Sequence, residues 1–124
     1  MKVNDKYDDH STSVSYFKHQ VKKFIEERNW SVYHTPKNLV QAINCEAGEL
    51  SQLLLFKDYK VEEILNNQKL LTDISDEIAD VFIYLISLIN ALELDLSQIF
   101  INKMEKNKKK YSSKEFNNGN YYKK

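Results

Sequence analysis

Two pairs of acidic residues could carry chemistry in this sequence. Glu46 and Glu49 stand three residues apart, and Glu77 and Asp80 repeat that spacing further along the chain. Side chains three residues apart lie on the same side of a helix, so each pair would bring two carboxylates together. The sequence therefore predicts an acidic cluster on each of two helices.

These acids interrupt rows of apolar residues at helical spacing. The first row consists of Leu39, Ile43, Leu50 and Leu53, and the second of Leu70, Ile74, Val81 and Leu85. Glu46 and Glu77 occupy positions within these rows where a packed helix ordinarily carries hydrocarbon. We therefore expect all four carboxylates to point into a helical interior.

A carboxylate cluster of this kind needs a compensating charge. Two carboxylates about 4 Å apart repel each other by roughly 4 kcal/mol at an effective dielectric constant near 20. Protonation, a buried basic partner or a cation would relieve that repulsion, and neither row contains Lys or Arg. Because His and Cys ligands are missing from both pairs, the donors suit a hard divalent ion. The predicted cofactor is Mg²⁺, with Mn²⁺ as a substitute.

Composition restricts the class of protein. With 124 residues the chain is long enough for one domain with a modest core. Two Gly and one Pro supply few tight turns, which argues against all-β and dinucleotide-binding folds. Eighteen basic residues balance eighteen acidic ones, so we expect neither nucleic acid nor membrane as a partner.

The cellular location follows from two further features. A single cysteine, Cys45, cannot form an internal disulfide and fits a reducing compartment. The first ten residues are polar, and no apolar stretch is long enough to span a bilayer. The expected location is cytoplasmic.

Apolar periodicity and capping residues predict an all-α, antiparallel bundle of about four main helices. The predicted helices cover residues 13–28, 36–56, 72–92 and 95–111, with a short additional helix at 61–65. Their predicted caps are Ser13 (or Ser11), Thr35 with Pro36 in the first turn, Thr72 and Asp95. Residues 1–12 are expected to be a flexible lead, 13–111 a single helical domain and 112–124 a disordered tail.

Several stretches around the acids occur in a recognisable order. They are Arg28-Asn29-Trp30, His34-Thr35-Pro36-Lys37-Asn38-Leu39, Asp80-Val81-Phe82-Ile83-Tyr84-Leu85, and Lys103-Met104 with Asn107 and Tyr111. Over about residues 15–111 the sequence resembles the MazG-like nucleotide pyrophosphohydrolases, and within them the dCTP pyrophosphatase branch. An acidic pair alone would be a weak signal, because such pairs are common on exposed helices.

The resemblance implies hydrolysis of a nucleoside triphosphate to the monophosphate and pyrophosphate. It also implies that Glu46, Glu49, Glu77 and Asp80 hold Mg²⁺. We assign Glu49 as the general base and Glu46 as the second catalytic carboxylate. The resemblance further implies a homodimer or homotetramer whose pocket is completed across an interface.

Substrate contacts are implied for a further set of residues. These are Trp30, Ser31, Val32, Tyr33, His34, Phe56, Tyr84, Lys103, Asn107 and Tyr111. Two positions depart from the branch and bear on its cytosine preference. Phe56 stands where the branch carries a Trp that packs on the base, and Val21 replaces a residue of the first helix that encloses it.

Other interpretations stay open at this point. Without the resemblance, Trp30 would be a core anchor, His34 a surface or capping residue, and the lysines of 103–110 a solvated helix end. A di-iron or di-manganese bundle would carry Glu-x-x-His pairs, which the acidic pairs here lack. A helical module that binds metal or nucleotide, or that mediates oligomerisation, without turnover is the main alternative to an enzyme.

Overall fold

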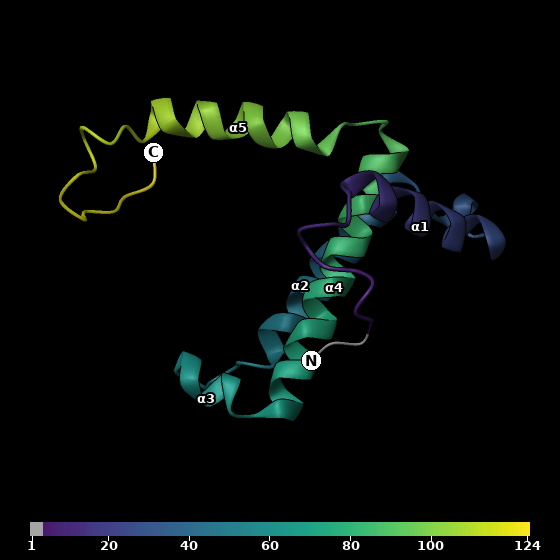
Figure 1. The fold of residues 1–124 in the computed structure, drawn as a ribbon, viewed down its shortest axis with the longest axis horizontal. Coiled ribbons are helices and arrows are strands. Elements are labelled where there is room, and N and C mark those ends of the chain that lie inside the picture. Colours follow the sequence, from purple (N-terminus) through teal and green to yellow (C-terminus); the bar gives the residue numbers. More distant parts are fainter. Residues whose placement is uncertain (1–3) are drawn as a thin grey trace. The chain divides into compact units, whose positions relative to one another are not determined.

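The computed structural model describes residues 4–124, and all regular structure among them is helical (Figure 1). In chain order the elements are α1 (Val14–Glu27), the 3₁₀ helix η1 (Ser31–Tyr33), α2 (Pro36–Gln52), α3 (Val61–Leu65), α4 (Gln68–Ala91) and α5 (Leu96–Lys110). The predicted all-α class is confirmed. Within the described residues, no helix combines the length and the apolar character that a membrane crossing requires.

The chain divides into two compact units. The first ends at Glu93 and contains α1 to α4, and the second, Leu94–Lys124, contains α5 and the segment after it. The predicted single domain over 13–111 therefore stays a prediction. The same holds for the flexible lead, of which residues 1–3 lie outside the described residues, and for the disordered tail.

Three helices begin where their capping residues predict. The side-chain oxygens of Ser13, Thr35 and Asp95 each accept the backbone N–H three residues further on, at 3.1, 3.3 and 3.0 Å respectively. Each bond satisfies one of the N–H groups that a helix leaves unpaired at its start. Pro36 lies in the first turn of α2, where its missing N–H costs nothing.

Helix α4 begins one turn earlier than predicted. Its cap is Asn67, whose side-chain oxygen accepts the N–H of Leu70 at 3.0 Å. Thr72 lies inside the helix, and its hydroxyl accepts from the Gln68 side chain at 3.3 Å. The prediction of Thr72 as the cap is wrong because an Asn carboxamide caps a helix at least as well as Thr, and Asn67 stands first in the chain.

Helix α2 ends before its predicted limit. The helix stops at Gln52, and Leu53 to Phe56 form turns. Phe56 has a φ of 57°, a left-handed conformation that a bulky residue rarely adopts and that cannot continue a helix. The prediction that α2 reaches Phe56 is therefore wrong.

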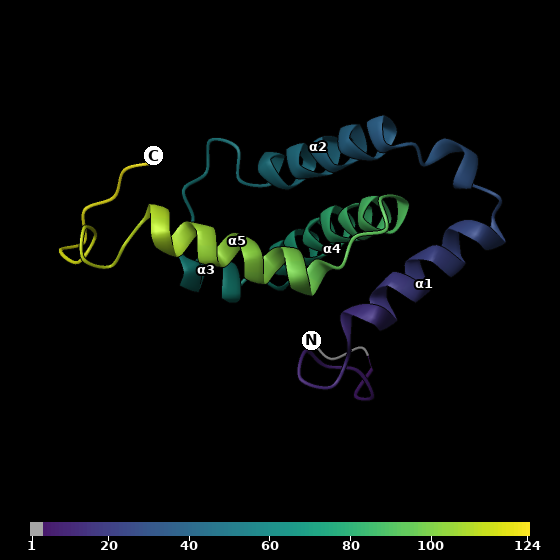
Figure 2. The same cartoon turned by 90° about the horizontal axis from the view of Figure 1, so that it is seen from above.

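The first unit is built on α2 and α4, which lie side by side and run antiparallel (Figures 1 and 2). Leu39 of α2 and Ile86 and Ile89 of α4 are its buried apolar side chains. Helix α1 also contacts α4. The Phe17 ring meets Phe82 edge-on at 5.7 Å between centroids, so α4 is held from a second side.

Candidate active site

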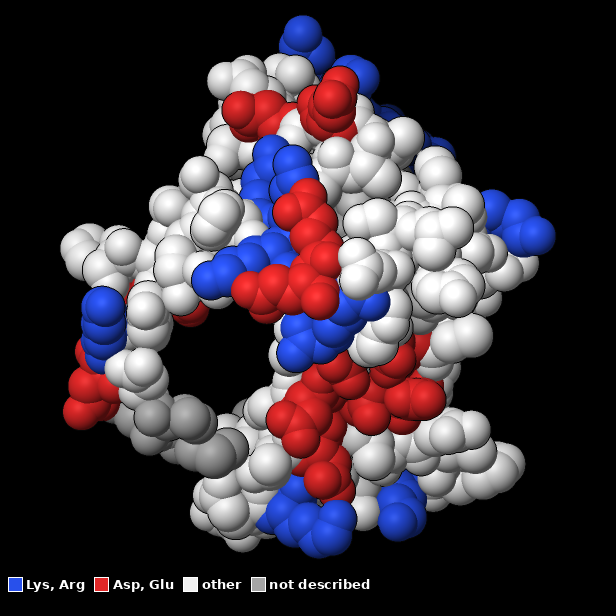
Figure 3. Space-filling model, turned by 90° about the vertical axis from the view of Figure 1, so that its right-hand side faces the viewer, with Lys and Arg blue, Asp and Glu red and all other residues white. Residues whose placement is uncertain are grey.

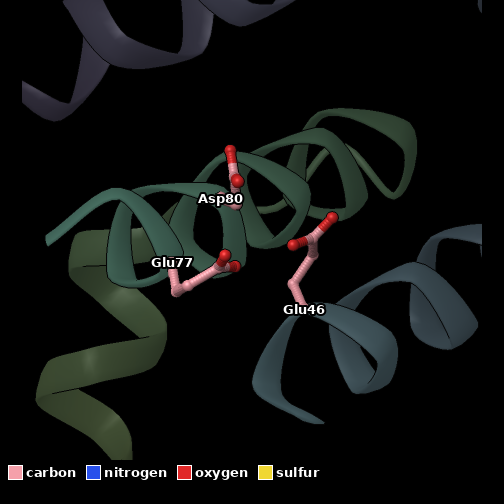
Figure 4. A group of neighbouring side chains, drawn as sticks. All are labelled: Glu46, Glu77 and Asp80. Atoms are coloured by element: carbon pink, nitrogen blue, oxygen red, sulfur yellow. The ribbon is translucent and has the colours of Figure 1, made fainter. Parts of the chain in front are cut away.

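Three of the predicted acids converge between α2 and α4. Glu46 comes from α2, and Glu77 and Asp80 come from successive turns of α4. One carboxylate oxygen from each lies within 4.8 Å of the others, and Figure 4 shows Glu46 and Glu77 extending toward each other with Asp80 beside them. The antiparallel pairing of the two helices places Glu46 opposite the α4 pair, which neither helix could achieve alone.

The burial of the four acids differs. Glu46 and Glu77 are half-buried, and the Oε2 atom of each is buried without a hydrogen-bond partner. Glu49 and Asp80 are exposed, so the prediction that all four point into the helical interior is wrong for these two. Asp80 lines a cavity rather than the packed seam, which explains its exposure. Glu49 lies outside the group of three.

The electrostatics of the cluster favour a positive ligand. Burial, followed by the neighbouring carboxylates of Glu49 and Asp80, raises the pKa of Glu46 to about 7. Burial and the charge of Glu49 also raise the pKa of Glu77. Because the pKa values of Glu46 and Glu77 are both raised, the ionised form of each carboxylate is disfavoured until a positive charge compensates it. Figure 3 shows a face on which Asp and Glu side chains adjoin one another in a continuous patch.

The donor set fits a hard divalent cation. Every side chain of the cluster offers oxygen, and the orphaned Oε2 atoms of Glu46 and Glu77 are ligand positions without a protein partner. Buried polar atoms ordinarily have a hydrogen-bond partner, so these two exceptions require an explanation. A divalent ion bound by carboxylates supplies one.

A cavity of about 960 Å³ opens beside the acids, within the range of small-molecule sites. Glu46 and Asp80 line it, together with three of the predicted substrate residues, Trp30, His34 and Tyr84. The rings of His34 and Tyr84 stack at 6.4 Å between centroids with 29° between their planes. The structure thus brings three aromatic rings and two of the acids to one cavity.

Other predicted substrate residues do not line that cavity. Ser31, Val32 and Tyr33 form η1 beside it, and Val32 and Tyr33 are 73% and 66% exposed. Phe56 is 99% exposed in the turn that follows α2. None of these four side chains lines the cavity, so their contact with a nucleotide stays a prediction.

The last three predicted residues belong to the second unit. Lys103 and Asn107 lie one turn apart on α5, and Tyr111 follows its end. The Tyr111 hydroxyl accepts the backbone N–H of Lys124 at 2.9 Å, and its ring meets Phe116 at 5.5 Å between centroids. Tyr111 thus already has partners within its own unit, and the predicted phosphate contacts of all three residues stay untested.

Several cavity residues were not among the predicted substrate contacts. On the α1 side these are Phe17, Gln20, Phe24 and Arg28, and on α4 they are Phe82, Ile83 and Ser87. The Arg28 guanidinium lies 3.7 Å from the centre of the Phe24 ring, which in turn meets Trp30 edge-on. The apolar period of α1 predicted an inward face, but no α1 residue is fully buried, and periodicity does not distinguish a core face from a cavity wall. Val21, which the resemblance placed near the base, does line the cavity.

Comparison with known proteins connects this site to characterised relatives. No protein-family model matches the sequence. The dCTP pyrophosphatase 1 of Mus musculus is 36% identical over 90 residues, which cover 72% of this chain and 53% of that protein. The Homo sapiens protein of the same name is 32% identical over 90 residues, with the same coverage of 72% and 53%. The chain therefore spans about half the length of the curated relatives it matches.

A solved structure matches over nearly the whole chain. The crystal structure of a pyrophosphatase from Archaeoglobus fulgidus superposes with a TM-score of 0.72 at 32% sequence identity. The match covers 90% of this chain and 99% of the other. The likeness therefore extends to the helices that carry the acids, well beyond a short motif.

Proposed function

The chain belongs to the MazG-like nucleotide pyrophosphohydrolases, in the dCTP pyrophosphatase branch, and from this we propose that it hydrolyses nucleoside triphosphates to monophosphate and pyrophosphate. The observation that carries the proposal is the group of Glu46, Glu77 and Asp80 at the edge of an aromatic cavity. Acids that hold a cation suit a triphosphate, and aromatic walls suit a nucleobase. The name of the relatives makes dCTP the first substrate to test.

We assign the metal site to Glu46, Glu49, Glu77 and Asp80 and the ion to Mg²⁺. When bound, Mg²⁺ neutralises phosphate charge and makes a water molecule a stronger nucleophile. Glu49 stands one turn from Glu46, and we assign it as the general base that would accept a proton from the attacking water. Glu46 is the second catalytic carboxylate that we propose.

The cavity residues position the nucleoside. Tyr84 lies one turn beyond Asp80 on α4, and His34 stacks against it, so the two rings stand next to the acids where the sugar would lie. Trp30, held edge-on by Phe24, offers an aromatic face for the base. This arrangement orients the nucleotide so that its α-phosphate reaches the carboxylates.

We propose that the active protein is a homodimer or homotetramer. Large apolar side chains stand exposed in both units, among them Phe56 at 99%, Val32 at 73% and Phe100 at 59%. The resemblance implies such an oligomer, and these exposed side chains are candidates for its interface. The exposed Cys45 thiol suits the cytoplasm, where thiols stay reduced.

Phosphorus NMR on the purified chain with Mg²⁺ and a panel of NTPs and dNTPs tests the proposal. Pyrophosphate plus monophosphate is the expected product pair, and the rates rank the bases. Orthophosphate plus diphosphate would contradict cleavage at the α-phosphorus. A protein that Mg²⁺ stabilises without any turnover would instead be a binding module.

A further inference from the structure

Ser87 carries a buried hydroxyl that the protein itself does not use. The residue is 5% exposed, and its Oγ atom is buried without a hydrogen-bond partner. A helical serine commonly donates to the carbonyl four residues earlier, as Ser75 does to Leu71 on the same helix at 2.7 Å. Ser87 lines the cavity, and its hydroxyl has no hydrogen-bond partner among the described residues.

The position of Ser87 along α4 indicates what it would meet. Glu77, Asp80, Tyr84 and Ser87 follow one another at helical spacing and therefore share one face of the helix. Seven residues separate Asp80 from Ser87, about 10 Å along the axis at ~1.5 Å per residue. Tyr84 lies between them. Ser87 is thus at the end of the row away from the acids.

The cavity wall near the polar side chain of Ser87 is largely apolar. The neighbouring cavity wall contains the apolar side chains of Phe17, Val21, Phe82 and Ile83. An apolar wall can stack on or enclose a base, but it discriminates poorly between bases of similar size. A buried hydroxyl in such a wall penalises any base that leaves it unpaired.

We propose that Ser87 is a specificity-determining residue whose hydroxyl forms a hydrogen bond with a polar atom on the edge of the nucleobase. The inference rests on the proposed function, which places the phosphates at the acids and so directs the base toward Ser87. Ser87 takes no part in the chemical step. Its role is to favour bases that present a donor or acceptor at this point.

The test compares Ser87→Ala with wild type in the full chain, using kcat/KM for dCTP, dTTP, dATP and dGTP with Mg²⁺. For the preferred base we expect a fall of about three- to tenfold, the effect of one neutral hydrogen bond. For the disfavoured bases the fall should be smaller, so the ranking of bases flattens. The loss should appear mainly in KM, because the bond forms in the ground state as well.

Two variants separate the hydroxyl from packing effects. Ser87→Cys keeps the side-chain size but bonds weakly, so it should flatten the ranking as Ser87→Ala does. Ser75→Ala is the matched control, because that hydroxyl serves its own helix and should leave the ranking unchanged. Neither Ser87 variant should lower the melting temperature of the nucleotide-free protein, since no protein partner loses a bond.

An equal loss for all four bases, or no loss, would overturn the inference, because the hydroxyl would then meet the sugar, a water molecule or the helix. The proposed function fails separately, if wild type releases no pyrophosphate from any nucleotide. In that case calorimetric binding of the four deoxynucleoside monophosphates decides the role of Ser87 without turnover. A base-dependent loss of affinity would support it, and base-independent or absent binding would refute it.

Discussion

The acidic cluster and the exposed apolar residues of this chain differ in whether other side chains of the same chain pack around them. Glu46, Glu77 and Asp80 meet within one chain, because α2 and α4 each cover the apolar face of the other. The apolar residues Phe56 and Phe100 are 99% and 59% exposed and have no such cover. The acidic group therefore forms by folding of one chain, whereas these apolar side chains stay exposed in the single chain.

This difference separates the proposed chemistry from the proposed recognition. The carboxylates that would hold the cation depend only on the pairing of α2 and α4. Phe56, which the resemblance assigns to base stacking, lies outside the cavity of its own chain. If a second copy covers the exposed residues, metal binding should survive in the monomer while recognition of the base should not.

The largest effect is expected from loss of a cluster carboxylate. Asp80→Asn and Glu46→Gln should each lower turnover at least about a hundredfold, because even outer partners of metal ligands cost ten- to a hundredfold. Steady-state pyrophosphate release measures the effect, and circular dichroism should show unchanged helicity. Asp76→Asn, an exposed acid on the same helix, is the matched control and should keep wild-type rates. Full activity in both cluster variants would refute the metal site.

The next effect concerns the exposed face of α5. Phe100→Glu should raise the dissociation constant of the proposed oligomer at least about tenfold, since burying a Phe contributes roughly 1.5–3 kcal/mol. Light scattering across a concentration series measures the shift. Asn102→Glu makes the same change of charge on the opposite side of α5 and should leave assembly intact. If wild type is already monomeric at high concentration, the oligomer is disproved.

The acidic cluster should also give the metal-free protein a pH-dependent stability. The folded Glu46 binds a proton with a pKa of about 7, above its ordinary 4.5, so the stability it contributes is lost as pH rises between these values. After chelation, the melting temperature should therefore fall from about pH 5 to about pH 8. Added Mg²⁺ should reverse the fall at the higher pH, because it compensates the ionised cluster.

Glu46→Gln provides the control for that measurement. The variant lacks the titrating group, so its melting temperature should depend less on pH over the same range. A metal-free wild type whose melting temperature is constant from pH 5 to pH 8 would contradict the electrostatic description of the cluster.

The smallest effect is expected at Phe56, where one variant tests both the backbone strain and the proposed contact with the base. A φ of 57° is strained for Phe but not for Gly, so Phe56→Gly should stabilise the chain by about 1 kcal/mol. The same variant should weaken dCTP binding a few-fold, because an aromatic contact contributes about 0.5–1.5 kcal/mol. Glu93→Gly, at a similar φ of 54°, should give the stability gain without the binding loss. Unchanged affinity in Phe56→Gly would remove Phe56 from the site.

The sequence alone determined the helical class and the candidate acids. Apolar spacing predicted helices close to α1, α2, α3 and α5, and the spacing of the acids singled out four carboxylates, three of which converge in the structure. Such patterns are local, because capping and periodicity involve residues a few positions apart. Where two local signals competed, as between Asn67 and Thr72 for the start of α4, the sequence did not rank them correctly.

Tertiary structure decided which side chains share a cavity and which are exposed. The apolar period of α1 could not show that the Phe24 ring meets Trp30, since that depends on how the chain turns after α1. Nor could it show that Ser87 would have no partner while Ser75 has one, because both are helical serines with a carbonyl four residues earlier. Residue type and spacing thus determined the candidate chemistry, whereas burial and the convergence of distant segments, which depend on packing, determined where a nucleotide could lie.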